Sequence, residues 1–147
     1  MGSTSSNETE LLGEKIGQKL KGGETIELVS DLGGGKTTFV RGLAKGLGSV
    51  DQVASPSFTI KREYYTGDLT LHHFDFHRLQ EPGEMLHDLA EVVNQPVNVV
   101  VVEWADKVQG ALPARRLTIT IKTTGETTRQ LNCKYPKQLA YLVEAVK

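Results

Sequence analysis

A glycine-rich loop between a strand-like and a helix-like segment is the feature that most constrains the fold of this chain. The stretch VSDLGGGKTTFV, residues 29–40, places three glycines directly before a lysine and two threonines. The preceding TIELV, residues 25–29, is short and rich in β-branched residues, which predicts a buried strand. After Lys36, apolar residues recur at helical spacing up to Gly48, which predicts a helix that ends there. A phosphate-binding loop requires this order of strand, glycine loop and helix.

The residue types in this loop suit the phosphates of a nucleotide. Successive backbone N–H groups in a glycine-rich loop form a concave anion site, and the start of the following helix adds partial positive charge. Lys36 is placed to contact the β- and γ-phosphates, and the Thr37 hydroxyl is placed to bind Mg²⁺. We therefore predict that the phosphates of a nucleotide are bound by Asp31, Leu32, Gly33, Gly34, Gly35, Lys36, Thr37 and Thr38.

Ser30 departs from the phosphate-loop pattern, which has a glycine at this position. A side chain is tolerated there if the backbone stays outside the left-handed region that favours glycine. The amides that would hold phosphate come later in the loop, so we expect at most a modest loss of affinity. The alternative interpretation of the stretch is a glycine-rich turn before a helix.

The remaining patterns predict a single α/β domain. The stretch VNVVVVEW, residues 97–104, is nearly continuously apolar, which is typical of a strand buried on both faces of a sheet. A helix is expected from Glu8, with Asn7 as its cap and Glu10 completing a capping box. Further strands are expected at 57–65, 69–76, 117–122 and 127–134, and further helices at 84–93 and 135–147.

A chain of 147 residues has the length of one domain with its own core. We assign residues 8–147 to a P-loop NTPase-like domain with a mixed central β-sheet flanked by helices. We assign residues 1–7 to a flexible N-terminus, and a cloning origin of these residues is one explanation for them.

Composition excludes several other classes of function. The formal net charge is −1 with both signs spread along the chain, so no strong field recruits nucleic acid or acidic lipid. Cys133 is the only cysteine, which excludes an intramolecular disulfide, and we expect it to be a plain buried or half-buried residue. The longest apolar run, near 99–102, is too short to cross a bilayer, and no signal segment is recognisable. We expect a cytoplasmic protein without membrane contact.

Two acids are candidates for chemistry beside the phosphates. Glu103 ends the apolar strand, at the edge where ligands gather in open α/β sheets, and with Thr37 it is our candidate Mg²⁺ ligand. A solvated residue at a strand end is the alternative for Glu103. Asp75, in the stretch HHFDFHR, is our candidate to position water or the metal shell near the γ-phosphate. His73, Asp75 and His77 share one face of a strand, which leaves zinc binding as an alternative.

Two further residues have less specific signals. Ser55 precedes a proline that forces extended backbone, and its segment is either a surface turn or a loop that senses the γ-phosphate. Trp104, the only tryptophan, is either a packing residue or a contact for a base or a partner. The predicted catalytic group is therefore Lys36, Asp75 and Glu103, with Ser55 and Trp104 as additional functional candidates.

Four stretches in order, DLGGGKTTFVRGLAKGLG, SPSFT, HHFDFHRL and VVVVEWADK, resemble the TsaE (YjeE) family of bacterial ATPases in tRNA threonylcarbamoyladenosine biosynthesis. The resemblance covers about residues 25–113. It implies an ATP-binding, weakly hydrolysing subunit that assembles with TsaB and TsaD. That pair transfers a threonylcarbamoyl group to adenosine 37 of tRNA, so tRNA is reached only through the complex.

The resemblance also implies roles for individual residues. Lys36 would contact phosphates, Thr37 and Glu103 would hold Mg²⁺, and Asp75 would organise the attacking water. Residues 55–58 would form a nucleotide-responsive loop, residues 6–9 would lie near the adenine, and Trp104 would be functionally sensitive. The chain departs from the family at Ser30, where glycine is usual, and at His77, where tyrosine is usual.

Two other classes of function use the same loop. A small-molecule kinase would need an acceptor pocket and an arginine-bearing lid, for which Arg78 is the candidate we find, without a long lid insertion. A nucleotide-dependent binding module would bind ATP without useful turnover. Because no arginine finger is obvious in the sequence, and such a group is worth roughly 10³–10⁵ in rate, we expect slow basal hydrolysis.

Overall fold

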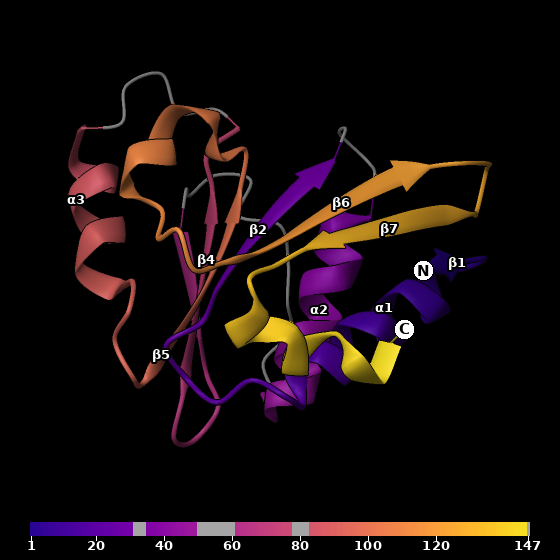
Figure 1. The fold of residues 1–147 in the computed structure, drawn as a ribbon, viewed down its shortest axis with the longest axis horizontal. Coiled ribbons are helices and arrows are strands. Elements are labelled where there is room, and N and C mark those ends of the chain that lie inside the picture. The colour runs from indigo at the N-terminus through magenta and orange to yellow at the C-terminus, as the bar shows by residue number, and fades with distance from the viewer. Residues whose placement is uncertain (31–34, 50–60, 78–82, 147) are drawn as a thin grey trace.

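The computed structural model describes residues 1–30, 35–49, 61–77 and 83–146 (Figure 1). Its centre is a seven-stranded sheet in the order β1-β7-β6-β2-β5-β4-β3. The inner strands β6, β2, β5 and β4 run parallel, and β3, β7 and β1 add antiparallel edges, which confirms the predicted mixed sheet. The strands are β1 Gly2–Ser3, β2 Thr25–Ser30, β3 Lys61–Tyr65, β4 Thr70–Asp75, β5 Asn98–Glu103, β6 Leu117–Thr123 and β7 Arg129–Lys134.

Helices cover both faces of this sheet, as Figure 1 shows. Val99 and Val101 of β5 pack in one core with α1, α2 and the C-terminal segment. Val100 and Val102 pack in a second core with α3 and η1. Burial on both faces explains why the β5 sequence is apolar without alternation. The helices are α1 Ser6–Gly17, α2 Lys36–Leu47 and α3 Gly83–Val92, with 3₁₀ helices η1 Ala105–Ala111, η2 Lys137–Leu142 and η3 Glu144–Val146.

The first helix begins earlier than predicted. Ser5, rather than Asn7, is its N-cap, and the Ser5 hydroxyl oxygen accepts a hydrogen bond from the N–H of Glu8 at 3.2 Å. The Glu8 carboxylate in turn accepts one from the N–H of Thr4 at 2.6 Å. Ser5 and Glu8 thus cap the helix in a variant of the capping box, in which the glutamate accepts from the residue before the N-cap. The serine at position 5 prevails over the asparagine at position 7.

Residues 1–7, which we assigned to a flexible N-terminus, contain β1 and the start of α1. Ser3 pairs with Arg129 of β7 in the sheet, and the hydroxyl oxygens of Ser3 and Thr9 lie 2.7 Å apart. The amino group of Met1 donates to the carbonyl oxygen of Leu131 at 3.3 Å. These contacts bring the beginning of the chain beside the β6–β7 hairpin.

The helix predicted over 135–147 is instead two short 3₁₀ helices, η2 and η3. Val143 separates them, with φ −107° and ψ −4°. Leu139 and Leu142 are three residues apart, as are Val143 and Val146, and this spacing aligns side chains in a 3₁₀ helix. The predicted apolar face is still buried, through Leu139, Leu142, Val143 and Val146.

Helices α1 and α2 pack so closely that their backbones are in contact. A Cβ atom at Gly42 would collide with the carbonyl oxygen of Glu10, and one at Gly46 with that of Glu14. Because only glycine fits at these contacts, α1 fixes the position of α2 and of its first residues. The four glycines of this interface are Gly13, Gly17, Gly42 and Gly46.

The expectation for Cys133 is also met. Cys133 is half-buried in β7, and burial raises the pKa of its thiol, as expected for a residue without a catalytic role. Within the described ranges, the structure contains no helix that is long and apolar enough to cross a membrane.

Candidate nucleotide-binding site

The carboxyl ends of three neighbouring strands form one edge of the site. Glu103, the last residue of β5, is in register with Leu28 of β2 on one side and with Asp75 of β4 on the other. Because these strands are parallel, Ser30, Glu103 and Asp75 end at the same edge of the sheet. In open α/β sheets, ligands bind outside this edge.

Helix α2 begins at that edge. Its N-cap is Gly35, with φ 100° and ψ 12°, a left-handed conformation that glycine adopts at little cost. Lys36 is the first residue of the helix, and it is buried, with only 8% exposure. Its Nζ donates to the carbonyl oxygen of Ser30 at 3.2 Å. The lysine therefore returns to the end of the strand that precedes the loop.

Ser30 is accommodated without backbone strain. It is the last residue of β2 and has strand geometry. Among the described residues other than glycine, positive φ angles occur at Asn94 and Trp104. The serine therefore does not need the conformation for which the phosphate-loop pattern uses glycine.

Glu103 is buried, with 3% exposure, so the alternative of a solvated strand end is wrong. Its Oε2 contacts Nε2 of His73, which is 0% exposed and lies on the adjacent strand β4. From the sequence alone, His73 is only a possible zinc ligand. In the part of the chain that the structure describes, no group of three or more His, Cys, Asp or Glu residues could hold a metal ion. The zinc alternative therefore has no support there.

Asp75 is less enclosed than Glu103. Its Oδ1 accepts a hydrogen bond from the N–H of His77 at 3.0 Å, which turns the chain after β4. The register of β4 and β5 places Asp75 directly beside Glu103. The two predicted acids are thus neighbours at the sheet edge, which their separation in the sequence did not show.

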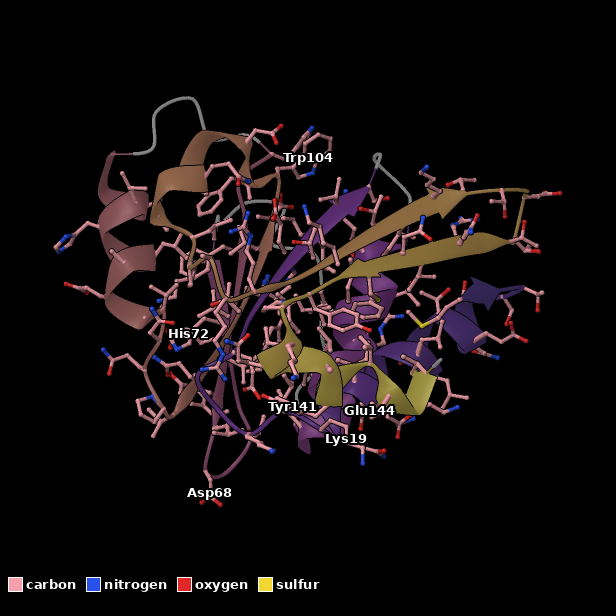
Figure 2. All side chains as sticks on the ribbon, viewed as in Figure 1. Lys19, Asp68, His72, Trp104, Tyr141 and Glu144 are labelled. Atoms are coloured by element: carbon pink, nitrogen blue, oxygen red, sulfur yellow. The ribbon has the colours of Figure 1, made fainter. Side chains whose placement is uncertain are left out.

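Trp104 precedes η1, and its ring lies against the ammonium group of Lys36. Its backbone has φ 55° and ψ 52°, a strained conformation for a bulky residue that typically costs about 1–3 kcal/mol. The Lys36 Nζ lies 4.7 Å from the centroid of its ring, and the His77 ring centroid lies 4.9 Å away. In Figure 2, Trp104 lies toward the upper side of the view, and Tyr141 and Asp68 lie below it. The tryptophan thus packs within the site.

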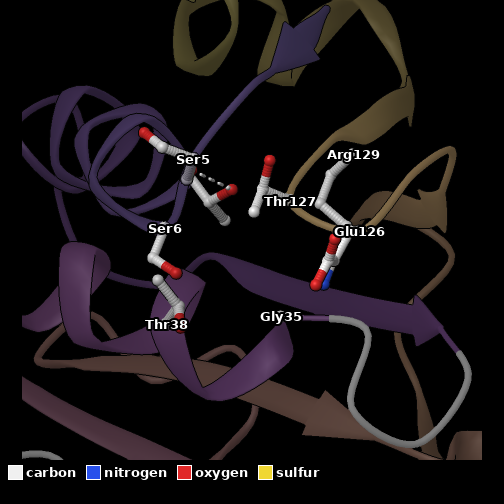
Figure 3. Close-up of a pocket in the computed structure, with 8 residues that line it drawn as sticks. Ser5, Ser6, Gly35, Thr38, Glu126, Thr127 and Arg129 are labelled. Atoms are coloured by element: carbon white, nitrogen blue, oxygen red, sulfur yellow. Dashed lines mark hydrogen bonds between the residues drawn. The ribbon is translucent and has the colours of Figure 1, made fainter.

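A cavity of about 200 Å³ lies beside the start of α2 (Figure 3). Three segments that are distant in sequence surround it: the start of α1, the start of α2 and the β6–β7 hairpin. The Nε of Arg129 lies 3.9 Å from the position that a Cβ would take at Gly35, so the guanidinium is near the α2 cap. The residues lining the cavity are Ser5, Ser6, Thr9, Gly35, Thr38, Glu126, Thr127 and Arg129.

Thr37 is half-buried in the first turn of α2. Six residues named from the sequence lie outside the described residues: Asp31, Leu32, Gly33, Gly34, Ser55 and Arg78.

A central parallel sheet, a glycine-capped helix after its first inner strand and acids at the neighbouring strand ends define a P-loop NTPase-like α/β fold. The family profile described as "Threonylcarbamoyl adenosine biosynthesis protein TsaE" matches residues 3–131. The chain therefore belongs to the TsaE family.

Individual relatives agree with this assignment. The tRNA threonylcarbamoyladenosine biosynthesis protein TsaE of Bacillus subtilis is 40% identical over 124 residues, which cover 84% of this chain and 77% of the relative. The TsaE protein of Treponema pallidum is 34% identical over 129 residues, covering 88% and 95%. The crystal structure of YdiB from Bacillus subtilis superposes with a TM-score of 0.82 at 33% identity, covering 99% of this chain and 90% of YdiB.

Proposed function

We propose that this chain is an ATP-binding, weakly hydrolysing subunit that supports threonylcarbamoyl transfer to adenosine 37 of tRNA. The transfer itself would be carried out by a complex of TsaB and TsaD homologues, and tRNA would be reached through that complex in the cytoplasm. Membership of the TsaE family and the names of its relatives support the pathway. The observation that carries the ATP-binding part is the buried Lys36 ammonium at the start of α2, 3.2 Å from the Ser30 carbonyl oxygen.

The triphosphate would lie against residues 31–38. A helix N-terminus offers unpaired N–H groups and partial positive charge, and the Lys36 ammonium adds a full charge at the same place. Both favour an anionic ligand. Lys36 would contact the β- and γ-phosphates, and Thr38 borders the cavity beside them.

The residues at the sheet edge fit Mg²⁺ as the companion of ATP. Mg²⁺ prefers oxygen ligands and usually takes one or two carboxylates together with substrate phosphates. The Thr37 hydroxyl, at the start of α2, and the Glu103 carboxylate, at the end of β5, are oxygen donors of this kind. They would hold the ion, which neutralises charge on the phosphates when bound. Asp75, beside Glu103, would orient the attacking water.

The nucleoside would occupy the cavity of about 200 Å³ next to the α2 cap. Ser6 and Thr9 line it, and the family resemblance places residues 6–9 near the adenine. Its lining of hydroxyls, a carboxylate and a guanidinium provides hydrogen-bond donors and acceptors for a base and a ribose.

The test is ATP hydrolysis by the purified chain, alone and with TsaB and TsaD homologues from the same source. We expect slow release of phosphate by the chain alone, faster release in the complex, and neither with Lys36→Ala. Transfer of the γ-phosphate to a metabolite without partner proteins would instead identify a kinase. A stable complex that shows no stimulation would indicate a binding module without useful turnover.

A further inference from the structure

We infer that His73 is a positioning residue: it holds the Glu103 carboxylate in the orientation that binds Mg²⁺ beside the phosphates of ATP. This inference rests on the proposed ATPase function and assigns a role to a residue outside the predicted catalytic group.

The contact is built into the sheet. His73 of β4 is in register with Val101 of β5, and Glu103 is the next residue of β5 on the same face. His73 Nε2 contacts Glu103 Oε2 across the two strands. Exposure is 0% for His73 and 3% for Glu103, so water does not compete for this contact. Two rigid, parallel strands therefore determine where the carboxylate lies.

The chemistry of the two groups fixes the direction of the hydrogen bond. An ionised carboxylate only accepts, so Nε2 of His73 carries the hydrogen and donates it. Its other ring nitrogen, Nδ1, is buried and has no hydrogen-bond partner among the described residues. A hydrogen bond to a charged acceptor in a buried site is strong, and it removes the rotational freedom of the glutamate side chain. The bond engages Oε2, and we assign Oε1 to the ion.

The surroundings of His73 argue against a role in filling the core. Leu71, Val99 and Val101 belong to the core on the same face of the sheet. An aliphatic side chain would fill this position without the cost of burying a ring nitrogen that has no partner. What an aliphatic residue cannot supply is the N–H that Glu103 receives.

The neighbouring histidine is a matched control. His72 lies on the same strand and is also buried, at 6% exposure, but its side chain points to the opposite face. Its Nε2 lies 3.0 Å from Oδ1 of Asn98, away from Glu103. A substitution at His72 changes the same strand but does not remove a partner of Glu103.

The experiment titrates Mg²⁺ against the affinity for a fluorescent ATP analogue. For His73→Leu we expect the half-saturating Mg²⁺ concentration to rise about 10- to 100-fold, the usual effect of removing a hydrogen bond to a metal ligand. Affinity for the analogue without Mg²⁺ should not change. His73→Gln, which keeps an N–H near the Nε2 position, and His72→Leu should both bind Mg²⁺ as the wild type does.

A folded His73→Leu with the wild-type Mg²⁺ midpoint, or an equal shift in His72→Leu, would overturn the role of His73 while ATP binding stands. A wild-type protein whose ATP affinity ignores Mg²⁺ would overturn the proposed function as well. If His73→Leu does not fold, ¹⁵N NMR of the wild-type imidazole decides instead. Hydrogen on Nε2, with a shift on addition of Mg²⁺ and ATP, supports the inference, and hydrogen on Nδ1 alone overturns it.

Discussion

Two buried glutamates lie at opposite ends of the sheet and differ in what satisfies them. Glu24, just before β2, and Glu103, at the end of β5, are each 3% exposed. The Glu24 carboxylate accepts the backbone N–H groups of Lys21 at 2.8 Å and Gly22 at 2.7 Å and the Tyr141 hydroxyl at 2.5 Å. Glu103 instead contacts the side chain of His73 through Oε2.

This difference separates an acid with a structural role from one that we propose binds a ligand. Both oxygens of Glu24 are engaged by donors from the chain itself, which ties the turn before β2 to the C-terminal segment. Glu103 lies beside Asp75 and at the same edge as the Lys36 ammonium. Equal burial therefore does not indicate an equal role, and the kind of partner distinguishes the two ends.

The largest effect, on ATP affinity, is expected at the carboxyl ends of the parallel strands. Lys36→Ala removes the ammonium that would contact the phosphates, and we expect the affinity for Mg²⁺-ATP to fall about 1,000-fold, or about 4 kcal/mol. Isothermal titration calorimetry measures it. The control is Lys45→Ala on the same helix, whose side chain is 63% exposed and should bind ATP normally. Unchanged affinity in Lys36→Ala would remove the lysine from the site.

Substitutions at the amino ends of the parallel strands, where Glu24 lies, should lower stability instead of ATP affinity. Glu24→Ala leaves its buried donors without an acceptor, and we expect the free energy of unfolding to fall by about 3 kcal/mol. Tyr141→Phe removes one of these bonds and should cost about 1 kcal/mol. Urea unfolding measures both, and ATP affinity should stay at the wild-type value. If Glu24→Ala lost ATP affinity while remaining folded, the two ends would not differ as described.

A substitution of Glu103, unlike one of Glu24, should lower activity. Glu103→Ala is expected to lower Mg²⁺-dependent turnover about 30-fold, or about 2 kcal/mol in the barrier, because it removes a ligand of the ion. ADP binding without Mg²⁺ should be retained. An equal loss of Mg²⁺-free ADP binding would indicate misfolding rather than a missing metal ligand.

The smallest effect concerns His72 and pH. Burial is the main cause that lowers its pKa below the ordinary 6.5, with Lys61 adding to the effect and Asn98 and Glu63 opposing it. The unfolded chain therefore binds a proton more readily than the folded one. The resulting loss of stability begins as pH falls through about 6.5 and has a slope of at most about 1.4 kcal/mol per pH unit.

Urea unfolding at pH 7.5 and pH 5.5 tests this prediction, with His72→Gln as the comparison. The wild type should lose more stability on acidification than the variant, since glutamine takes up no proton. Equal losses in both proteins would show that His72 does not titrate differently on folding.

The sequence predicted well what is determined locally. The continuous valines of β5, the helix from Lys36 to the glycine at 48, and the hairpin of β6 and β7 all follow from periodicity and turn residues. It was less reliable where two local signals compete, as at the N-cap of α1, where Ser5 prevails over Asn7.

The site was predictable only in part, because part of it depends on the order of strands. Glu103 was named from its position at the end of a strand and Asp75 from the stretch HHFDFHR, but their adjacency needs β4 and β5 to be neighbours. The contact of His73 with Glu103 depends on the same pairing. Arg129 and Glu126 were missed because they reach the cavity beside Gly35 only once the hairpin lies next to the start of α1. No local pattern in the sequence encodes that arrangement.

A crystal structure grown with Mg²⁺ and a non-hydrolysable ATP analogue tests the central claim most directly. The account predicts the triphosphate at the N-terminus of α2 in contact with Lys36, and the ion beside Thr37 and Glu103. Nucleotide density at another surface, or none at saturating analogue, would contradict it.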